Sequence, residues 1–229
     1  MVFTDRVYNY TVEKALSPDK IKTSREYYVL AVLKYLCPEV FSQLEKSETP
    51  DLQNRDGLLG VEVTWGGSPR DEIINGENYK LRYAKTEKQR ERCLETIRKE
   101  GGNRDKYTIS YPMSTGTDDK NNIEKIVKKK LNKIHIYKEK CSRVGLAILL
   151  DIPLFFLTDK NWESWLSNIN NNGFNFIILL HWSGIDICFF ETNEYRSIRF
   201  KDREENMMLH KIARMTTEGI IKESDLEWT

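Results

Sequence analysis

Residues 50–65 read PDLQNRDGLLGVEVTW, and the second half of this stretch decides the fold. Asn54 to Gly57 form a turn signal, and the apolar, β-branched run LLGVEVTW at 58–65 then predicts a strand. Alternate residues of a strand share a face, so Glu62 and Thr64 point one way and the apolar residues at 59, 61, 63 and 65 point the other. A strand this apolar is expected to be central in its sheet, where an ionised carboxylate needs a partner cation or a metal ion. Glu62 is therefore a candidate site residue.

Helices and strands are predicted on both sides of this strand. A helix is expected to begin at Thr23 or Ser24 and to end at Cys37-Pro38, because the residue before proline avoids helical angles. A shorter amphipathic piece, EVFSQLEK, follows it. A strongly periodic helix is predicted at 121–140, and the continuous apolar run at 144–157 is typical of a strand buried on both faces. A short helix in NWESWLSNI, two strands joined at Ser183-Gly184 and a terminal helix complete the series.

This order predicts one α/β or α+β domain with an insertion. We place the core at 23–67 and 121–200 and a C-terminal helix at 204–222. The stretch 68–120 is charged and weakly patterned, with one expected helix in TEKQRERCLETIRKE, and we interpret it as an inserted basic lobe.

Composition limits the classes of protein that fit. The chain has 229 residues, of which 36 are basic and 35 acidic, so any affinity for nucleic acid must come from a local patch. No apolar run reaches about 18 residues, and the N-terminus lacks the apolar segment of a signal peptide. The four widely spaced cysteines argue against a disulfide scaffold and a zinc ribbon. We therefore expect a soluble, cytoplasmic protein with no membrane partner.

Asp51 lies beside the same turn as Glu62 and is placed to act with it. Two carboxylates and a backbone carbonyl suit Mg²⁺, a hard ion that takes few protein oxygens and keeps several waters. A plainer interpretation stays open, because Pro-Asp is a common turn dipeptide and Asp51 could serve the turn alone.

The pair Pro50-Asp51 and Glu62-Val63-Thr64, separated by ten residues, resembles the motif of the PD-(D/E)XK nuclease superfamily. By element order the resemblance covers residues 24–65 and 121–150, and its EVT-type strand is similar to that of bacterial and phage members. It implies a restriction-endonuclease-like core, in which a central mixed sheet is flanked by helices. It also implies hydrolysis of phosphodiester bonds in DNA or RNA with Mg²⁺ or Mn²⁺, the metal being bound by Asp51 and Glu62. Nucleic acid is then the expected partner, and a homodimer is plausible because double-strand cutters of this fold often pair two sites.

The motif lysine of the family is replaced here by Thr64. Members of the superfamily can supply this lysine from the following helix, where Lys130 lies in the middle of an apolar stripe and Lys133 on its flank. The stripe, at 100° per residue, consists of Ile123, Val127, Ile134, Tyr137 and Cys141. A lysine on an apolar face must find a carboxylate, reach solvent or shift its pKa. We predict that Lys130 pairs with Glu62, with Lys133 as second choice; the alternative is that Lys130 extends past the stripe to solvent.

Glu26 is the candidate for the family's helix-borne carboxylate. It lies on the face of Leu30, Leu33 and Cys37, at spacings of four, seven and eleven. The alternative is an acid in the first helical turn, where the helix dipole favours it.

Two basic segments could receive a polyanion. Residues 121–140 carry seven lysines against two acids, and residues 80–106 carry ten basic residues against five acids. From them we predict nucleic-acid contacts by Lys128, Lys129, Lys133, Arg82 and Lys85. A solvated helix face is the alternative for such charge runs.

Three functions remain open from the sequence. The first is a metal-dependent nuclease. The second is a nuclease-like fold that has lost catalysis and binds nucleic acid or inhibits a protein, and Thr64 favours it. The third is a small-molecule enzyme on another α/β scaffold, for which the chain carries no cofactor fingerprint.

Overall fold

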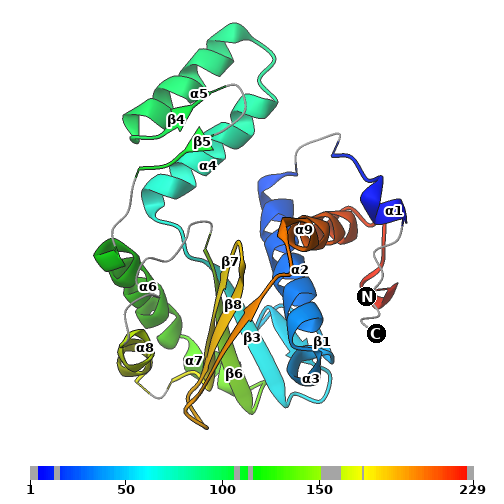
Figure 1. The fold of residues 1–229 in the computed structure, drawn as a ribbon, viewed down its shortest axis with the longest axis vertical. Coiled ribbons are helices and arrows are strands. Elements are labelled where there is room, and N and C mark those ends of the chain that lie inside the picture. Colours follow the sequence, from blue (N-terminus) through cyan, green and yellow to red (C-terminus); the bar gives the residue numbers. More distant parts are fainter. Residues whose placement is uncertain are drawn as a thin grey trace.

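The computed structural model describes residues 5–12, 16–105, 109–112, 116–150, 161–171 and 173–225. Its centre is a seven-stranded mixed sheet with the order β1-β2-β3-β6-β7-β8-β9 (Figure 1). The strands span Leu44–Lys46 (β1), Leu52–Asn54 (β2), Leu59–Trp65 (β3), Arg143–Leu149 (β6), Phe176–His181 (β7), Gly184–Phe189 (β8) and Glu194–Arg199 (β9). β1, β2 and β3 form an antiparallel meander, β3, β6 and β7 are parallel, and β8 and β9 continue antiparallel.

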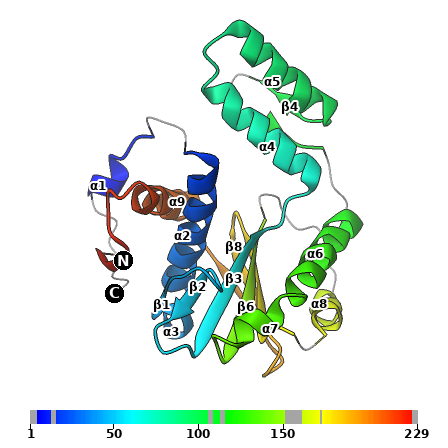
Figure 2. The same cartoon turned by 180° about the vertical axis from the view of Figure 1, so that it is seen from behind.

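Helices cover both faces of the sheet (Figures 1 and 2). α2 and α9 lie on one face, while α6, α7 and α8 lie on the other. They span Pro18–Leu36 (α2), Arg203–Thr217 (α9), Gly116–Leu131 (α6), Ile134–Lys138 (α7) and Trp162–Asn170 (α8). Shorter helices span Asp5–Tyr8 (α1), Pro38–Phe41 (α3) and Glu223–Asp225 (η2). The expected α/β fold, with a mixed sheet between helices, is confirmed.

Side-chain alternation on the central strands divides the interior into two cores. On β3, Leu59, Val61 and Val63 pack with α2 and α9. On β6, Leu146 and Ile148 point the other way and pack with α6 and α8. Strands buried on both faces need apolar residues at consecutive positions, which accounts for the unbroken run that begins at Val144. The structure describes the predicted strand at 144–157 only up to residue 150; the rest lies outside the described residues.

The predicted start of the first helix is wrong. α2 begins at Pro18, not at Thr23 or Ser24, with Ser17 as its N-cap residue. Proline is favoured in the first turn because it has no N–H to leave unpaired and its φ is already helical. Glu26 therefore lies in the middle of α2, and the alternative that it serves the first-turn dipole is wrong as well.

Two other local predictions need correction, and one strand was missed. The piece EVFSQLEK is helical only to Phe41 and then enters β1 at Leu44. The single helix expected at 121–140 is two helices, because α6 ends at Leu131 and α7 begins at Ile134. β9 was not predicted, since its sequence EYRSIR is polar and its side chains are mostly exposed at the edge of the sheet.

Residues 68–105 and 109–112 form a helical lobe that projects from the sheet beyond the end of β3 (Figure 1). It contains α4 (Pro69–Arg82), α5 (Glu87–Lys99) and the two-stranded sheet of β4 (Asn103–Arg104) and β5 (Ile109–Ser110). α5 was expected and α4 was not. A small core of Ile74, Leu81, Cys93 and Ile97 holds the two helices together. In the described part of the chain, no helix has the length and apolar content needed to cross a membrane.

Candidate active site

Asp51 and Glu62 are brought together by the pairing of β2 with β3. The register aligns Leu52 with Val61, so its continuation places Asp51 opposite Glu62. Both carboxylates are buried. One oxygen of Asp51, Oδ2, accepts the backbone N–H of Val63 at 2.9 Å, which fixes the carboxylate against the middle of β3.

Lys130 reaches Glu62 from α6, on the side of the sheet that Glu62 faces. Its Nζ lies 2.5 Å from Oε1 of Glu62. The Lys130 side chain is 20% exposed and that of Glu62 is 9% exposed, so little water screens the pair. Of the two alternatives for this lysine, pairing with the carboxylate is the one present. Thr64, on the same face of β3, is half-buried, and Lys133 is exposed at the start of α7.

Glu26 joins the same group from α2 through a second lysine. Its two oxygens lie 3.3 Å from Nζ of Lys22 and 3.0 Å from Nζ of Lys46. Lys22 also lies 3.5 Å from Oδ1 of Asp51, so one ammonium connects the helix-borne carboxylate to the turn carboxylate. Sequence reasoning missed Lys22 and Lys46. The spacing of Lys22 and Glu26, i and i+4 on one helix, is a signal that could have found the first of them.

The site therefore holds three buried carboxylates and three lysines: Glu26, Asp51 and Glu62 with Lys22, Lys46 and Lys130. Burial and the negative charge of Glu62 raise the pKa of Asp51, although the Val63 N–H and the charges of Lys22 and Lys130 oppose the shift. Burial, the charge of Glu62 and a hydrogen bond to Glu62 also raise the pKa of the Tyr137 hydroxyl. Burial and the charge of Glu62 therefore disfavour further negative charge at this site, and the three lysines match the three carboxylates in number.

The oxygen atoms that this site could offer a cation belong to the carboxylates of Asp51 and Glu62. Among the residues that the structure describes, no group of three or more His, Cys, Asp or Glu side chains is arranged to hold a metal ion. Oε1 of Glu62 lies 2.5 Å from Nζ of Lys130, and Oδ2 of Asp51 accepts the Val63 N–H. Oδ1 of Asp51 lies 3.5 Å from Nζ of Lys22, whose side chain is 73% exposed.

The predicted nucleic-acid contacts divide into two groups. Lys128, Lys129 and Lys133 are exposed near the end of α6, and Lys128 pairs with Glu124 at 2.5 Å. Arg82 and Lys85 are exposed where α4 ends in the lobe. Because α6 ends beside α7 and α4 belongs to the lobe, the two groups lie on separate surfaces (Figure 1).

A second buried ionic network lies between β7, β8 and β9, apart from these carboxylates. Asp186 is fully buried and accepts hydrogen bonds from His181 at 2.7 Å, Tyr195 at 2.6 Å and Arg199 at 3.1 Å. Burial alone would raise the pKa of Asp186, but these hydrogen bonds, with one from Ser197, outweigh it and lower the pKa to about 2. The network joins three strands, with His181 on β7, Asp186 on β8 and Tyr195 and Arg199 on β9.

Comparisons with known proteins found no match: no protein-family model, no curated protein and no solved structure is detectably similar to the chain. Function must therefore be inferred from the site itself.

Proposed function

We propose that this protein is a metal-dependent nuclease that hydrolyses phosphodiester bonds of DNA or RNA with a PD-(D/E)XK-type site. The observation that carries the proposal is the buried pair of Lys130 and Glu62, with Asp51 opposite Glu62 on the next strand. Thr64 stands where the motif has its lysine, and the Lys130 ammonium, 2.5 Å from Oε1 of Glu62, would take the role of that lysine.

The surrounding elements support the same proposal. Asp51 directly precedes β2 and Glu62 lies on β3, both after the long helix α2, and the parallel neighbour of β3, β6, comes after α6. This is the helix and strand context that the resemblance implies for a restriction-endonuclease-like core. Glu26, on α2, would serve as the helix-borne carboxylate, and its oxygens lie 3.3 Å from Nζ of Lys22 and 3.0 Å from Nζ of Lys46.

Each residue has a role that follows from its charge and place. Asp51 and Glu62 would hold the cation, which when bound supplies a Lewis acid for the phosphoryl group and a water of lowered pKa. Lys130 stabilises the negative charge that develops on the phosphoryl group and orients the attacking water. Glu26 acts as a positioning residue, because it reaches the other carboxylates through Lys22.

A cleavage assay tests this function. Wild-type protein and Glu62→Gln are incubated with single- and double-stranded DNA and RNA in Mg²⁺, Mn²⁺ or EDTA. We expect cleavage only with metal, and a loss of at least about 100-fold in the variant, as for removal of a group that acts in the transition state. Glu124→Gln is the matched control, since Glu124 pairs with a lysine of the same helix at the same 2.5 Å but at the surface. Cleavage that persists in EDTA, or at the wild-type rate in Glu62→Gln, would refute the proposal.

Thr64 favours a second candidate, a nuclease-like protein that has lost catalysis and binds nucleic acid or a protein partner through its basic surfaces. The same assay separates the two, because this candidate binds nucleic acid without cutting it in either metal. Nucleic acid as a partner, a homodimer and a cytoplasmic location stay predictions.

A further inference from the structure

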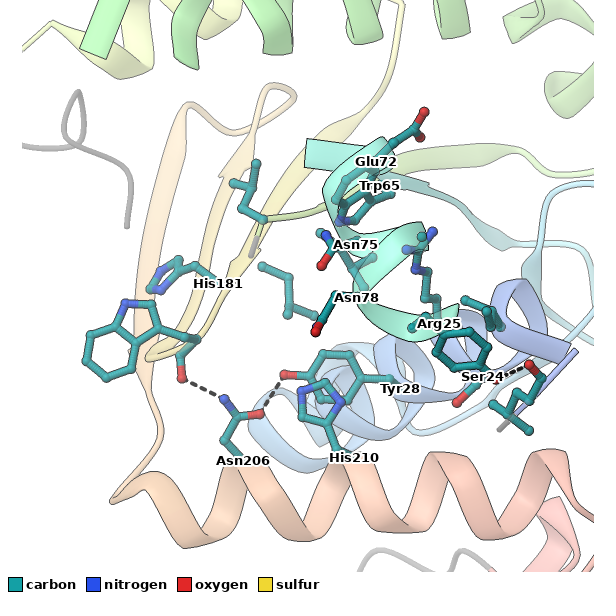
Figure 3. Close-up of a pocket in the computed structure, with 18 of the residues that line it drawn as sticks. Ser24, Arg25, Tyr28, Trp65, Glu72, Asn75, Asn78, His181, Asn206 and His210 are labelled. Carbon is teal, nitrogen blue, oxygen red and sulfur yellow. Dashed lines mark hydrogen bonds between the residues drawn. The ribbon is translucent and has the colours of Figure 1, made fainter. Parts of the chain in front are cut away.

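A deep cleft opens between the lobe and the core at the carboxyl ends of the parallel strands. Its volume is about 960 Å³, within the range of small-molecule sites. α4 forms one wall and α2 with α9 the other (Figure 3). Its floor is apolar and consists of Leu149, Leu150 and Leu180, where β6 and β7 end.

Three asparagine side chains line this cleft, and two of them have partners. Asn206 accepts the Tyr28 hydroxyl at 2.7 Å and donates to the Trp182 carbonyl at 2.7 Å, as the dashed lines in Figure 3 show. Asn75 accepts the hydroxyl of Tyr111 within the lobe. Asn78 differs, because its Oδ1 has no hydrogen-bond partner within the described part of the chain, although the residue is only 7% exposed.

A buried amide oxygen without a partner is costly, so a ligand that brings an N–H group to it gains binding energy there. The other residues that line the cleft indicate the chemical class of this ligand. Trp65, with the Arg25 guanidinium 5.0 Å above its ring, and Trp182, which is 58% exposed, offer aromatic surface. Arg25 and Arg82 bring positive charge against Glu72, whereas Lys80 is paired with Glu77 at 2.6 Å. Aromatic faces, positive charge and an amide edge together suit a planar base that carries a phosphate.

We propose that this cleft binds a single nucleotide of a nucleic-acid strand. The base lies over the apolar floor, its amino or imino N–H donates to Oδ1 of Asn78, and Arg25 and Arg82 supply the charge for its phosphate. Amide side chains read base edges in this way in other nucleic-acid complexes. The inference rests on the proposed function, because it names a part of the nucleic-acid strand that the protein would hold apart from the carboxylate site, none of whose six residues lines the cleft. Its test, however, needs no cleavage.

Binding of the four nucleoside monophosphates AMP, GMP, CMP and UMP to the full chain in EDTA tests the proposal, with tryptophan fluorescence as the readout. We expect saturable binding of at least one of them with a Kd below about 1 mM, and weaker binding of the matching nucleoside, which lacks the phosphate. Asn78→Leu should weaken the tightest nucleotide about tenfold, the loss of about one hydrogen bond. Its Tm should stay unchanged or rise, because an apolar group of similar shape replaces an unpaired amide.

Two controls separate this inference from the proposed function. Asn103→Leu changes an exposed asparagine of the lobe and should bind as the wild type does. Glu62→Gln should lose cleavage but keep nucleotide binding, because Glu62 faces the other side of the sheet from the cleft's Trp65. Absence of saturable binding by all four nucleotides, or an Asn78→Leu affinity equal to that of the wild type, would overturn the inference even if the protein cuts nucleic acid. Conversely, nucleotide binding that depends on Asn78 in a protein that cuts nothing would support it while the nuclease proposal fails.

Discussion

Replacing Lys130 with methionine removes the ammonium from the buried pair but keeps an unbranched side chain of similar length. In the variant, Glu62 loses its cation at 2.5 Å and faces Asp51 across the β2–β3 ladder. Burial and the charge of Glu62 already raise the pKa of Asp51, so the two carboxylates repel each other in the wild type. Removing Lys130 increases that repulsion.

The size of the effect follows from burial. Removing one partner of a fully buried ion pair costs about 3–5 kcal/mol, whereas an exposed pair contributes about 0–1 kcal/mol. Lys130 keeps 20% exposure and Glu62 9%, which places the pair between these limits but nearer the first. We expect Lys130→Met to lower the free energy of unfolding by about 2–3 kcal/mol.

Urea denaturation at pH 7 measures this loss, and the same helix provides the control. Lys128 pairs with Glu124 at the same 2.5 Å, but its side chain is 64% exposed, so Lys128→Met should cost less than about 1 kcal/mol. The double variant Lys130→Met/Glu62→Gln should be more stable than Lys130→Met, because it leaves no uncompensated charge. If Lys130→Met costs no more than Lys128→Met, Lys130 reaches solvent and the reasoning is refuted.

Three further predictions concern the remaining charges. Because the pKa of Asp51 is raised in the folded protein, its ionised form destabilises the fold at pH values above the usual carboxyl pKa. Asp51→Asn should therefore increase the free energy of unfolding at pH 7, while cleavage is lost. A variant less stable than the wild type would contradict this. Because the pKa of Asp186 is lowered to about 2, its contribution of about 2–3 kcal/mol is present above pH 4 and is lost as the pH falls through about 2. Urea denaturation between pH 2 and 7 should therefore show a wild-type advantage over Asp186→Asn that disappears in acid, and a constant difference would be evidence against it. The double variant Lys129→Ala/Lys133→Ala should weaken the salt dependence of binding to double-stranded DNA. The slope of log Kd against log salt concentration should fall by about 0.9 for each phosphate that the variant no longer neutralises. An unchanged slope would show that these two lysines do not contact the DNA.

Periodicity in the sequence was enough to predict the central pair. The alternation of side chains along β3 predicted which face of the sheet Glu62 lies on. The apolar positions of the predicted helix at 121–140 predicted that Lys130 points towards the sheet. The stripe was drawn through a single helix, yet α6 ends at Leu131. Lys130 precedes the break, so its direction was unaffected by the error.

Other features depend on tertiary contacts that no local pattern encodes. β1 and β2 have three residues each and are strands because they pair with each other and with β3. Lys46 meets Glu26 only because β1 packs under α2. The cleft at Asn78 exists because the lobe folds back toward α2 and α9, and the sequence of α4, which is largely polar, gives no sign of which asparagine is buried.

The central claim is that Asp51 and Glu62 hold a divalent cation beside Lys130. A crystal soaked in MnCl₂ tests it most directly, because the anomalous signal locates the ion without knowledge of the substrate. We predict a peak within coordinating distance of both carboxylates, absent from a soaked Glu62→Gln crystal. Manganese bound elsewhere on the chain, with no peak between Asp51 and Glu62, would contradict the claim.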